Sequence, residues 1–216
     1  MFITLEGIEG SGKTTQVEKI VSFFQTRGHE CVSTREPGGT AVGAQIRTIL
    51  LNPQNHEMDP GTELLLYVAD RVQHLLTVIR PHLSAGRVVV CDRFFDATLV
   101  YQGYARGVDK HLIQRLHHLM CSDARPDVTF LFDLDPAQSL ARAWRQIDSG
   151  GRAHGETRFE KEKLDFHQRV RDGYLDIAKS DPKRFRIVDA SQDARTVGRT
   201  LEAQLSLLIH DTRPDR

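Results

Sequence analysis

Long apolar segments are missing from this sequence. The longest uninterrupted apolar run, Leu64 to Ala69, has six residues, whereas a membrane-spanning helix needs about 20. The first residues, Phe2 to Leu5, are followed directly by the charged Glu6, so they do not resemble the apolar region of a signal peptide. We therefore expect no membrane segment and a cytoplasmic protein.

An excess of charge of either sign is also absent. Lys and Arg number 29, Asp and Glu number 29, and the net charge at pH 7 is zero. Proteins that coat nucleic acid or anionic membranes through bulk charge need a clear basic excess. We expect neither nucleic acid nor a membrane as a partner.

Cysteine is scarce as well. Cys31, Cys91 and Cys121 are odd in number and widely spaced, which excludes a disulfide framework and a zinc cluster. The ten histidines include no His-Glu-x-x-His pattern, so they predict no metal site of that type. Repeats, low-complexity tracts and linker-like stretches are missing too, and we expect one domain over residues 1–216.

What the sequence does contain is an alternation of short apolar segments and longer amphipathic ones. Val17, Ile20 and Phe24 follow the spacing of a helix face, whereas residues 88–91 form the β-branched run of a strand covered on both faces. Such alternation predicts an α/β three-layer sandwich with a central parallel sheet of about five strands. The expected strands are 2–6, 31–35, 88–91, 128–134 and 185–188; besides the helix stopped by Gly28, the expected helices are 41–51, 61–85, 110–121, 137–147, 159–179 and 194–209.

A glycine-rich motif lies between the first expected strand and the first expected helix. The segment Gly7-Ile8-Glu9-Gly10-Ser11-Gly12-Lys13-Thr14 matches Gly-x4-Gly-Lys-Ser/Thr at every fixed position. Backbone N–H groups of such a loop, together with the helix N-terminus, surround phosphates. Lys13 supplies a charge for the β- and γ-phosphates, and the Thr14 hydroxyl can ligate Mg²⁺. A glycine-rich turn that matches by chance is the alternative, but the flanking strand and helix favour a nucleoside triphosphate site.

A phosphate-binding loop does not by itself define a function. GTPases read guanine through Asn-Lys-x-Asp, and neither Asn52 nor Asn55 is followed by lysine. A small kinase needs an acceptor site, cations for the transition state and a mobile cover. The glycine-rich segment 148–158 is the candidate lid, with Arg152 and Arg158 as its candidate cations. A solvated loop whose arginines have no role is the alternative.

Candidates for an acceptor site follow the second and third expected strands. The turn at Pro37 follows the second strand. Tyr67 and Arg71 are four residues apart, so they share a helix face and could hold a planar ring between an aromatic surface and a hydrogen-bond donor. Asp92 and Arg93 end the third strand and offer a carboxylate for a metal ion and a cation for a phosphate. A core-edge tyrosine beside a surface arginine, and a strand-end ion pair, are the alternatives.

Together these segments resemble the bacterial form of the thymidylate kinase family, whose members phosphorylate dTMP to dTDP. The resemblance covers nearly the whole chain and includes the segments 2–7, 34–40, 64–71, Asp92-Arg93-Phe94, Tyr101-Gln102-Gly103, 132–136, the lid and 188–190. It implies the P-loop fold of nucleoside monophosphate kinases, ATP as donor, Mg²⁺ as cofactor and a homodimer. A kinase with another acceptor (a different nucleoside monophosphate or a deoxynucleoside) and a nucleotide-binding switch without phosphate transfer are the rival hypotheses.

The resemblance also implies roles for individual residues. Gly10 stands where the eukaryotic-type loop has arginine, so the missing cation is expected from the lid, at Arg158 or less securely at Arg152. The family's usual serine is Ala97, and Thr98 is expected to supply the lost hydroxyl. The other implied roles are Glu9 near the 3′-hydroxyl of the acceptor, Tyr67 stacked on thymine, Arg71 donating to a base carbonyl, Arg93 on the dTMP phosphate, Asp92 near Mg²⁺ and Tyr101 against the sugar 2′ position.

The mechanism that we expect is in-line attack of a dTMP phosphate oxygen on the γ-phosphorus of ATP. The acceptor oxygen is already anionic near neutral pH, so no strong general base is required. Catalysis then consists of positioning and of charge neutralisation by Lys13, Mg²⁺, Arg93 and the lid arginines.

Overall fold

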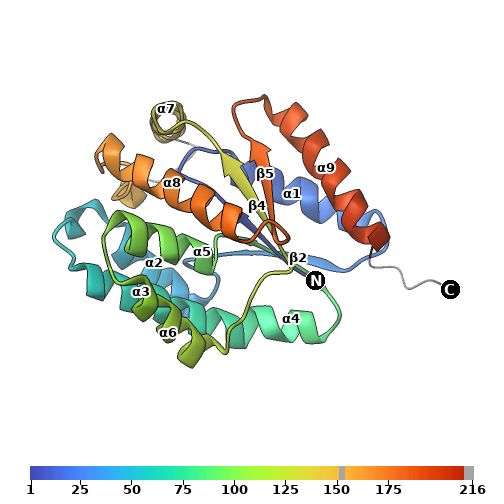
Figure 1. Ribbon diagram of the computed structural model, residues 1–216, viewed down its shortest axis with the longest axis horizontal. Helices are drawn as coiled ribbons and strands as arrows, with labels where there is room; N and C mark the ends of the chain where they lie inside the picture. Colours follow the sequence, from blue (N-terminus) through green and yellow to red (C-terminus); the bar gives the residue numbers. More distant parts are fainter. Residues whose placement is uncertain (151–153, 212–216) are drawn as a thin grey trace.

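The computed structural model describes residues 1–150 and 154–211. Its centre is a sheet of five parallel strands in the order β2-β3-β1-β4-β5. Figure 1 shows helices on both faces of this sheet, which confirms the expected three-layer α/β sandwich. The strands are β1 (Phe2–Glu6), β2 (Cys31–Arg35), β3 (Val88–Asp92), β4 (Val128–Asp133) and β5 (Phe185–Asp189).

Several helices begin at a side chain that accepts hydrogen bonds from the first backbone N–H groups, which a helix leaves unpaired. Thr40 does so for α2, Asp59 for α3, Asp109 for α6 and Asp135 for α7. None of the described helices is long and apolar enough to cross a membrane. The α-helices are α1 (Lys13–Gln25), α2 (Ala41–Leu51), α3 (Pro60–His74), α4 (Arg80–Ser84), α5 (Phe95–Thr98), α6 (Lys110–Cys121), α7 (Pro136–Asp148), α8 (Leu164–Ser180) and α9 (Ala194–Asp211); short 3₁₀ turns are η1 (Pro53–Asn55) and η4 (His154–Glu156).

Successive residues of each strand pack into different layers, because side chains alternate across a strand. Ile3 and Leu5 of β1 cluster with apolar side chains of α1 and α9 on one face. Phe2, on the other face, clusters with Val89 and with Ile79. Both faces are therefore covered by helices, which explains why the strands are continuous apolar runs.

The carboxyl ends of β1 and β3 lie side by side, with Leu5 paired to Asp92. The loop 7–12 leaves β1 there, and Arg93 leaves β3. In open parallel sheets, ligands bind beyond this edge where the chain turns toward opposite faces. The fold thus places the two strongest sequence motifs next to each other.

Two segments contain π-helices that the sequence did not predict. Residues 95–105, which were not predicted to be helical, form α5 and the π-helix η3 (Leu99–Ala105). A π-helix has i→i+5 hydrogen bonds, so its apolar residues do not follow the 3.6 spacing. The expected helix 61–85 is continuous, but η2 (Leu75–Ile79) is also a π-helix inside it.

The helix expected at 159–179 begins later, at Leu164. Phe159 and the residues after it form a turn instead, in which the Glu162 N–H donates to the Phe159 carbonyl oxygen. The Phe159 ring packs against Phe166 and Tyr101, with ring centres 6.2 and 5.3 Å away. Burial of this aromatic ring therefore outweighs continuation of the helix.

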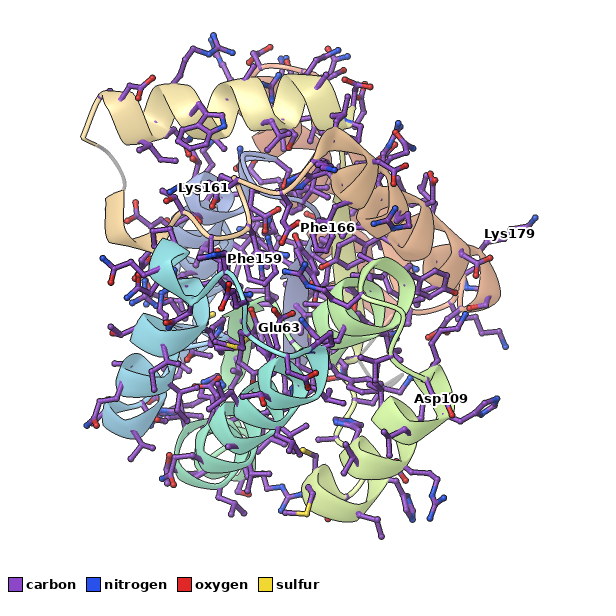
Figure 2. The ribbon with its side chains drawn as sticks, turned by 90° about the vertical axis from the view of Figure 1, so that its left-hand side faces the viewer. Glu63, Asp109, Phe159, Lys161, Phe166 and Lys179 are labelled. Atoms are coloured by element: carbon purple, nitrogen blue, oxygen red, sulfur yellow. The ribbon has the colours of Figure 1, made fainter. Side chains whose placement is uncertain are left out.

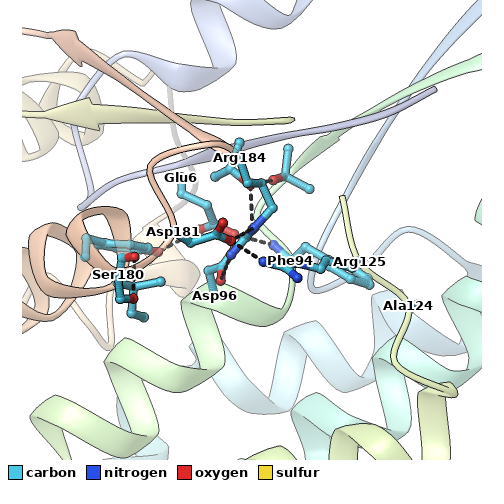
Figure 3. A network of polar contacts seen from close by, with 12 residues as sticks. Glu6, Phe94, Asp96, Ala124, Arg125, Ser180, Asp181 and Arg184 are labelled. Atoms are coloured by element: carbon cyan, nitrogen blue, oxygen red, sulfur yellow. Dashed lines mark hydrogen bonds and ion pairs between the residues drawn. The ribbon is translucent and has the colours of Figure 1, made fainter. Parts of the chain in front are cut away.

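A polar network joins α5 to the segment between α8 and β5 (Figure 3). The Arg184 guanidinium donates to both carboxylate oxygens of Asp96, at 2.5 and 2.9 Å, and to Asp181 at 2.7 Å. Burial, and then the charge of Asp96, raise the pKa of the neighbouring Glu6 to about 7. Glu6 accepts hydrogen bonds from Phe94 N and the Tyr174 hydroxyl, both at 2.7 Å.

Candidate functional site

The predicted phosphate-binding residues 7–14 form one compact loop that ends in the first turn of α1. Gly7, Gly10 and Gly12 have φ angles of 137°, 75° and 89°, which residues with a Cβ rarely adopt. A Cβ on Gly10 would lie 2.3 Å from the Ser139 carbonyl oxygen, so α7 packs directly against the loop. The loop leads directly into the N-terminus of α1, and anions bind at helix N-termini.

The Lys13 side chain is buried and lies across this loop. Its ammonium group donates to the carbonyl oxygens of Gly7 at 2.8 Å and Ile8 at 3.0 Å, and to the Ser11 hydroxyl at 3.3 Å. Burial, and then the charge of Arg93, lower the pKa of Lys13 to about 8. A nearby anion favours the charged form of lysine, so a phosphate bound in this loop would stabilise the Lys13 ammonium group.

Thr14 and Asp92, the two predicted metal ligands, lie together. The Thr14 hydroxyl donates to Asp92 Oδ2 at 2.9 Å, and both residues line the pocket of the phosphate-binding loop. Across residues 1–150 and 154–211, no group of three or more His, Cys, Asp or Glu side chains could hold a metal ion. Two hard oxygen ligands fit Mg²⁺, which completes its coordination with water and substrate phosphates.

Arg93 connects the loop to a second pocket. Its φ of 71° lies in the left-handed region, which is uncommon outside glycine and concentrates at functional sites. Its Nη2 donates to Glu9 Oε1 at 2.9 Å, and its Nη1 donates to the Tyr174 hydroxyl at 3.2 Å. The Tyr101 hydroxyl donates to the same Glu9 oxygen at 2.6 Å, so three predicted site residues meet here.

Glu9 is ionised in this setting. Burial raises the pKa of its carboxyl, but the Arg93 guanidinium, followed by His167 and Tyr101, holds that pKa well below its usual range. An ionised carboxylate only accepts hydrogen bonds. Glu9 therefore presents an acceptor to any ligand at this junction.

The second pocket is lined by Pro37, Tyr67 and Arg71, as predicted for an acceptor site. Arg71 is 2% exposed, and its Nε donates to Glu36 Oε2 at 2.9 Å. His74 Nδ1 lies 2.9 Å from the other Glu36 oxygen. Because both oxygens of this buried carboxylate are engaged, the arginine is held in one orientation.

Thr98, the predicted replacement for the family's serine hydroxyl, is buried next to Arg71. It is 1% exposed, it is not among the residues that line the second pocket, and its hydroxyl accepts a hydrogen bond from Arg71 Nη2 at 2.8 Å. Ala97 does line the pocket. The Thr98 side chain thus contacts the buried Arg71 guanidinium in this structure, and its predicted contact with the base stays a prediction.

Arg158, the predicted lid cation, is not among the residues that line either pocket. Its side chain is 3% exposed, and its Nη2 lies 2.6 Å from Glu63 Oε2. Its Nε donates to the Leu50 carbonyl oxygen at 2.5 Å. Figure 2 shows Glu63 and Phe159 in the interior of the molecule. A buried ion pair therefore holds Arg158 in this structure, and its role as the catalytic cation of a lid stays a prediction; Arg152 falls outside the described residues.

Three residues of the site were missed by the sequence analysis. Arg47 lines both pockets, and its Nη1 donates to the Pro37 carbonyl oxygen at 3.0 Å. Gln102 lines the second pocket and donates to Glu63 Oε1 at 2.6 Å. His167 Nδ1 lies 3.5 Å from Glu9 Oε2. Gln102 could have been found because it belongs to the Tyr101-Gln102-Gly103 segment of the family resemblance. For Arg47 and His167, the sequence offers no indication beyond their positions in expected helices.

The two pockets are contiguous and differ in character. They share Glu9, Glu36, Arg47 and Arg93. The first contains the phosphate-binding loop, and the second has aromatic walls such as Tyr67. Such a pair suits a triphosphate and a planar ring that approach each other at two arginines.

The parallel sheet, the phosphate-binding loop and the adjoining aromatic pocket define a P-loop kinase of small molecules. Comparison with known proteins narrows this class, because the family model described as thymidylate kinase matches residues 5–200. The chain belongs to the thymidylate kinase family.

Individual relatives agree along the whole chain. The thymidylate kinase of Desulfosudis oleivorans is 52% identical over 214 residues, which cover 99% of this chain and all of that protein. The thymidylate kinase of Desulforapulum autotrophicum is 56% identical over 190 residues, covering 88% of this chain and 84% of the relative. The crystal structure of the thymidylate kinase from Ehrlichia chaffeensis superimposes with a TM-score of 0.73 at 35% identity, covering 95% of this chain and 98% of the other.

Proposed function

We propose that the two pockets hold ATP and dTMP end to end, with the reacting phosphates meeting at Arg47 and Arg93. As a member of its family, the protein is a dTMP kinase, which transfers the γ-phosphate of ATP to dTMP and releases dTDP and ADP. The observation that carries the proposed arrangement is that both arginines line both pockets. Cations at such a junction neutralise charge that builds up between two anionic substrates.

Residues 7–14 bind the ATP phosphates in this proposal, with Lys13 on the β- and γ-phosphates. Thr14 and Asp92 would hold the metal ion, which supplies neutralisation of phosphate charge when bound. Lys13 leaves the loop carbonyls for the phosphate, because an ionic hydrogen bond is stronger than one to a neutral carbonyl.

On the acceptor side, the planar thymine lies against Tyr67, and the Arg71 guanidinium donates to a base carbonyl. Arg71 is supported by Glu36 and Thr98, so we assign Thr98 to positioning rather than to contact with the base. Tyr101 stands against the sugar 2′ position, where an additional hydroxyl would collide. Pro37 and Gln102 complete the wall of this pocket.

Glu9 and Arg93 place the acceptor. The Arg93 guanidinium binds the dTMP phosphate, and the Glu9 carboxylate accepts from the 3′-hydroxyl of the sugar. An acceptor oxygen that is already anionic needs no general base, so orientation and charge neutralisation carry the rate. Arg47 lines both pockets and is our candidate for a second cation beside Arg93, although its guanidinium is paired with Glu156 in this structure, at 2.6 and 3.0 Å; the lid arginines remain candidates for the same role.

We further propose a single domain with a lid at 148–158, a homodimer and a cytoplasmic location. The basis for the location is that both nucleotides are present in the cytoplasm. For the dimer, helices α3 and α6 pack against each other and carry exposed leucines. These exposed apolar side chains are Leu65 on α3, Leu76 on η2, and Leu112, Leu119 and Met120 on α6.

The proposed substrate arrangement is tested by a coupled ADP-release assay with dTMP, dUMP, dCMP, dGMP and thymidine as acceptors. We expect the highest kcat/KM with dTMP and negligible turnover with thymidine, which lacks the phosphate that Arg93 binds. Preference for a purine monophosphate, or turnover of thymidine, would contradict the assignment of the second pocket. Light scattering of the purified protein tests the dimer separately.

A further inference from the structure

Two buried polar atoms beside the acceptor pocket have no hydrogen-bond partner within the described part of the chain. They are Glu9 Oε2 and His167 Nε2. Glu9 is 8% exposed and His167 is 1% exposed. An unpaired buried polar atom costs stability, so this arrangement requires a physical reason.

The two oxygens of Glu9 differ in what they contact. Oε1 accepts hydrogen bonds from Arg93 and from Tyr101, which occupies both of its lone-pair positions. Oε2 has His167 beside it, with Nδ1 at 3.5 Å. Glu9 lines both pockets, and of its two oxygens Oε2 is the one without a hydrogen-bond partner in the described part of the chain.

His167 reaches this position from α8. It lies on the buried face of that helix, which also carries Val170 and Tyr174. His167 is not among the described residues that line the two pockets. It therefore acts on a nucleotide through Glu9 and not by direct contact.

We propose that His167 is a positioning residue for the acceptor sugar, holding Glu9 Oε2 so that it accepts a hydrogen bond from the 3′-hydroxyl of dTMP. This inference rests on the proposed function. His167 Nδ1, at 3.5 Å from Oε2, makes an electrostatic contact without a hydrogen bond, so Oε2 keeps a lone-pair position for the ligand. An acceptor without a 3′-hydroxyl leaves this buried oxygen unpaired, so the site discriminates against it.

The test compares dTMP with 3′-deoxythymidine 5′-monophosphate in the wild-type protein and in His167→Leu. We expect the ratio of kcat/KM for the two acceptors to fall by about tenfold in His167→Leu, as for loss of one positioned hydrogen bond. The loss is expected in the KM for dTMP, with kcat and the kinetics of the 3′-deoxy acceptor nearly unchanged. A merely structural role would weaken both acceptors alike.

Two amide variants provide a matched pair. His167→Asn places an amide nitrogen near the position of Nδ1 and is expected to keep the wild-type ratio. His167→Gln places its amide near Nε2, so we expect the kcat/KM ratio to fall as it does in His167→Leu. The Gln variant therefore also serves as the test if His167→Leu does not fold. Thermal unfolding of each variant shows whether the fold is intact.

The outcomes separate this inference from the proposed function. Absence of dTMP turnover in the wild-type protein overturns both. Normal dTMP turnover with an unchanged ratio in His167→Leu and His167→Gln overturns only the role of His167. Equal losses for both acceptors, or no difference between the Asn and Gln variants, also overturn it.

Discussion

Arg93 Nη2 lies 2.9 Å from Glu9 Oε1, and these two side chains both line the phosphate pocket and the aromatic pocket. Glu9 comes from the loop after β1, and Arg93 comes from the end of β3. Because β1 and β3 are neighbours, the sheet itself sets the distance between the donor and acceptor sites. The ion pair is the point where the proposed substrates meet.

Lys13→Ala is expected to lower kcat by at least about 10³-fold while the protein stays folded. Lys13 contacts loop carbonyls and the Ser11 hydroxyl, so its removal leaves no buried charge unpaired. The measurement is the ADP-release rate together with the melting temperature. Lys19→Ala on the same helix, a partly exposed lysine whose ammonium donates to the Ala194 carbonyl oxygen, is the control and should retain activity; a Lys13→Ala variant as active as this control would refute the role of the loop.

Arg71→Ala is expected to raise the KM for dTMP by about 10- to 100-fold, because hydrogen bonds to a charged group are worth about 1.5–3 kcal/mol. The KM for ATP should not change. Thr98→Val removes the hydroxyl that Arg71 contacts and should raise the KM for dTMP by a smaller factor. If Thr98→Val weakens dTMP more than Arg71→Ala, then Thr98 contacts the base directly and its assignment to positioning is wrong.

Arg158→Ala is expected to destabilise the fold. Its partner Glu63 is fully buried and would lose one of its cations, a change that typically costs about 3–5 kcal/mol. Urea unfolding measures this loss. The matched variant Arg47→Ala, at a partly exposed site, should unfold nearly as the wild type does but lose activity. Wild-type stability of Arg158→Ala with kcat reduced by orders of magnitude would instead restore the catalytic role that the sequence suggested.

Glu6 gives the stability a pH dependence of defined sign. Its pKa is raised from 4.5 to about 7 in the folded protein, so between these values the folded state binds more protons than the unfolded state. The contribution of Glu6 to the free energy of unfolding is fully present below pH 4.5 and is lost as the pH rises to 7. This contribution is on the order of 3 kcal/mol.

In the Glu6→Gln variant, position 6 no longer titrates. The melting temperature of the variant minus that of the wild type should therefore increase as the pH rises from 4.5 to 7.5. Melting curves across this range are the measurement. Glu57→Gln, at an exposed glutamate, is the control for the introduction of an amide. A flat difference for Glu6→Gln would contradict the raised pKa.

Much of the fold could be predicted because strands buried on both faces leave a strong local signal. Residues 88–90 are all valine, and the burial of β1 and β3 matches that pattern. Segment 95–105 could not be predicted in this way. Its π-helix η3 breaks the periodicity, and the side chain of Phe94 provides no N-terminal cap.

The residues of the site also differ in whether their sequence signal is local. The phosphate-binding loop is contiguous in sequence, so its motif is sufficient. Arg47 and His167 enter the site only through packing of α2 and α8, far along the chain from Glu9. The position of Arg158 depends on the buried partner Glu63, and neither sequence spacing nor family resemblance indicates that ion pair.

The most direct measurement is calorimetric titration with a compound that joins adenosine and thymidine through five phosphates, since it spans both proposed sites. We expect one molecule bound per chain, competition with both ATP and dTMP, and affinity lowered at least about tenfold in Arg93→Ala. Simultaneous binding of this compound and dTMP to one chain, or unchanged affinity in Arg93→Ala, would contradict the end-to-end arrangement.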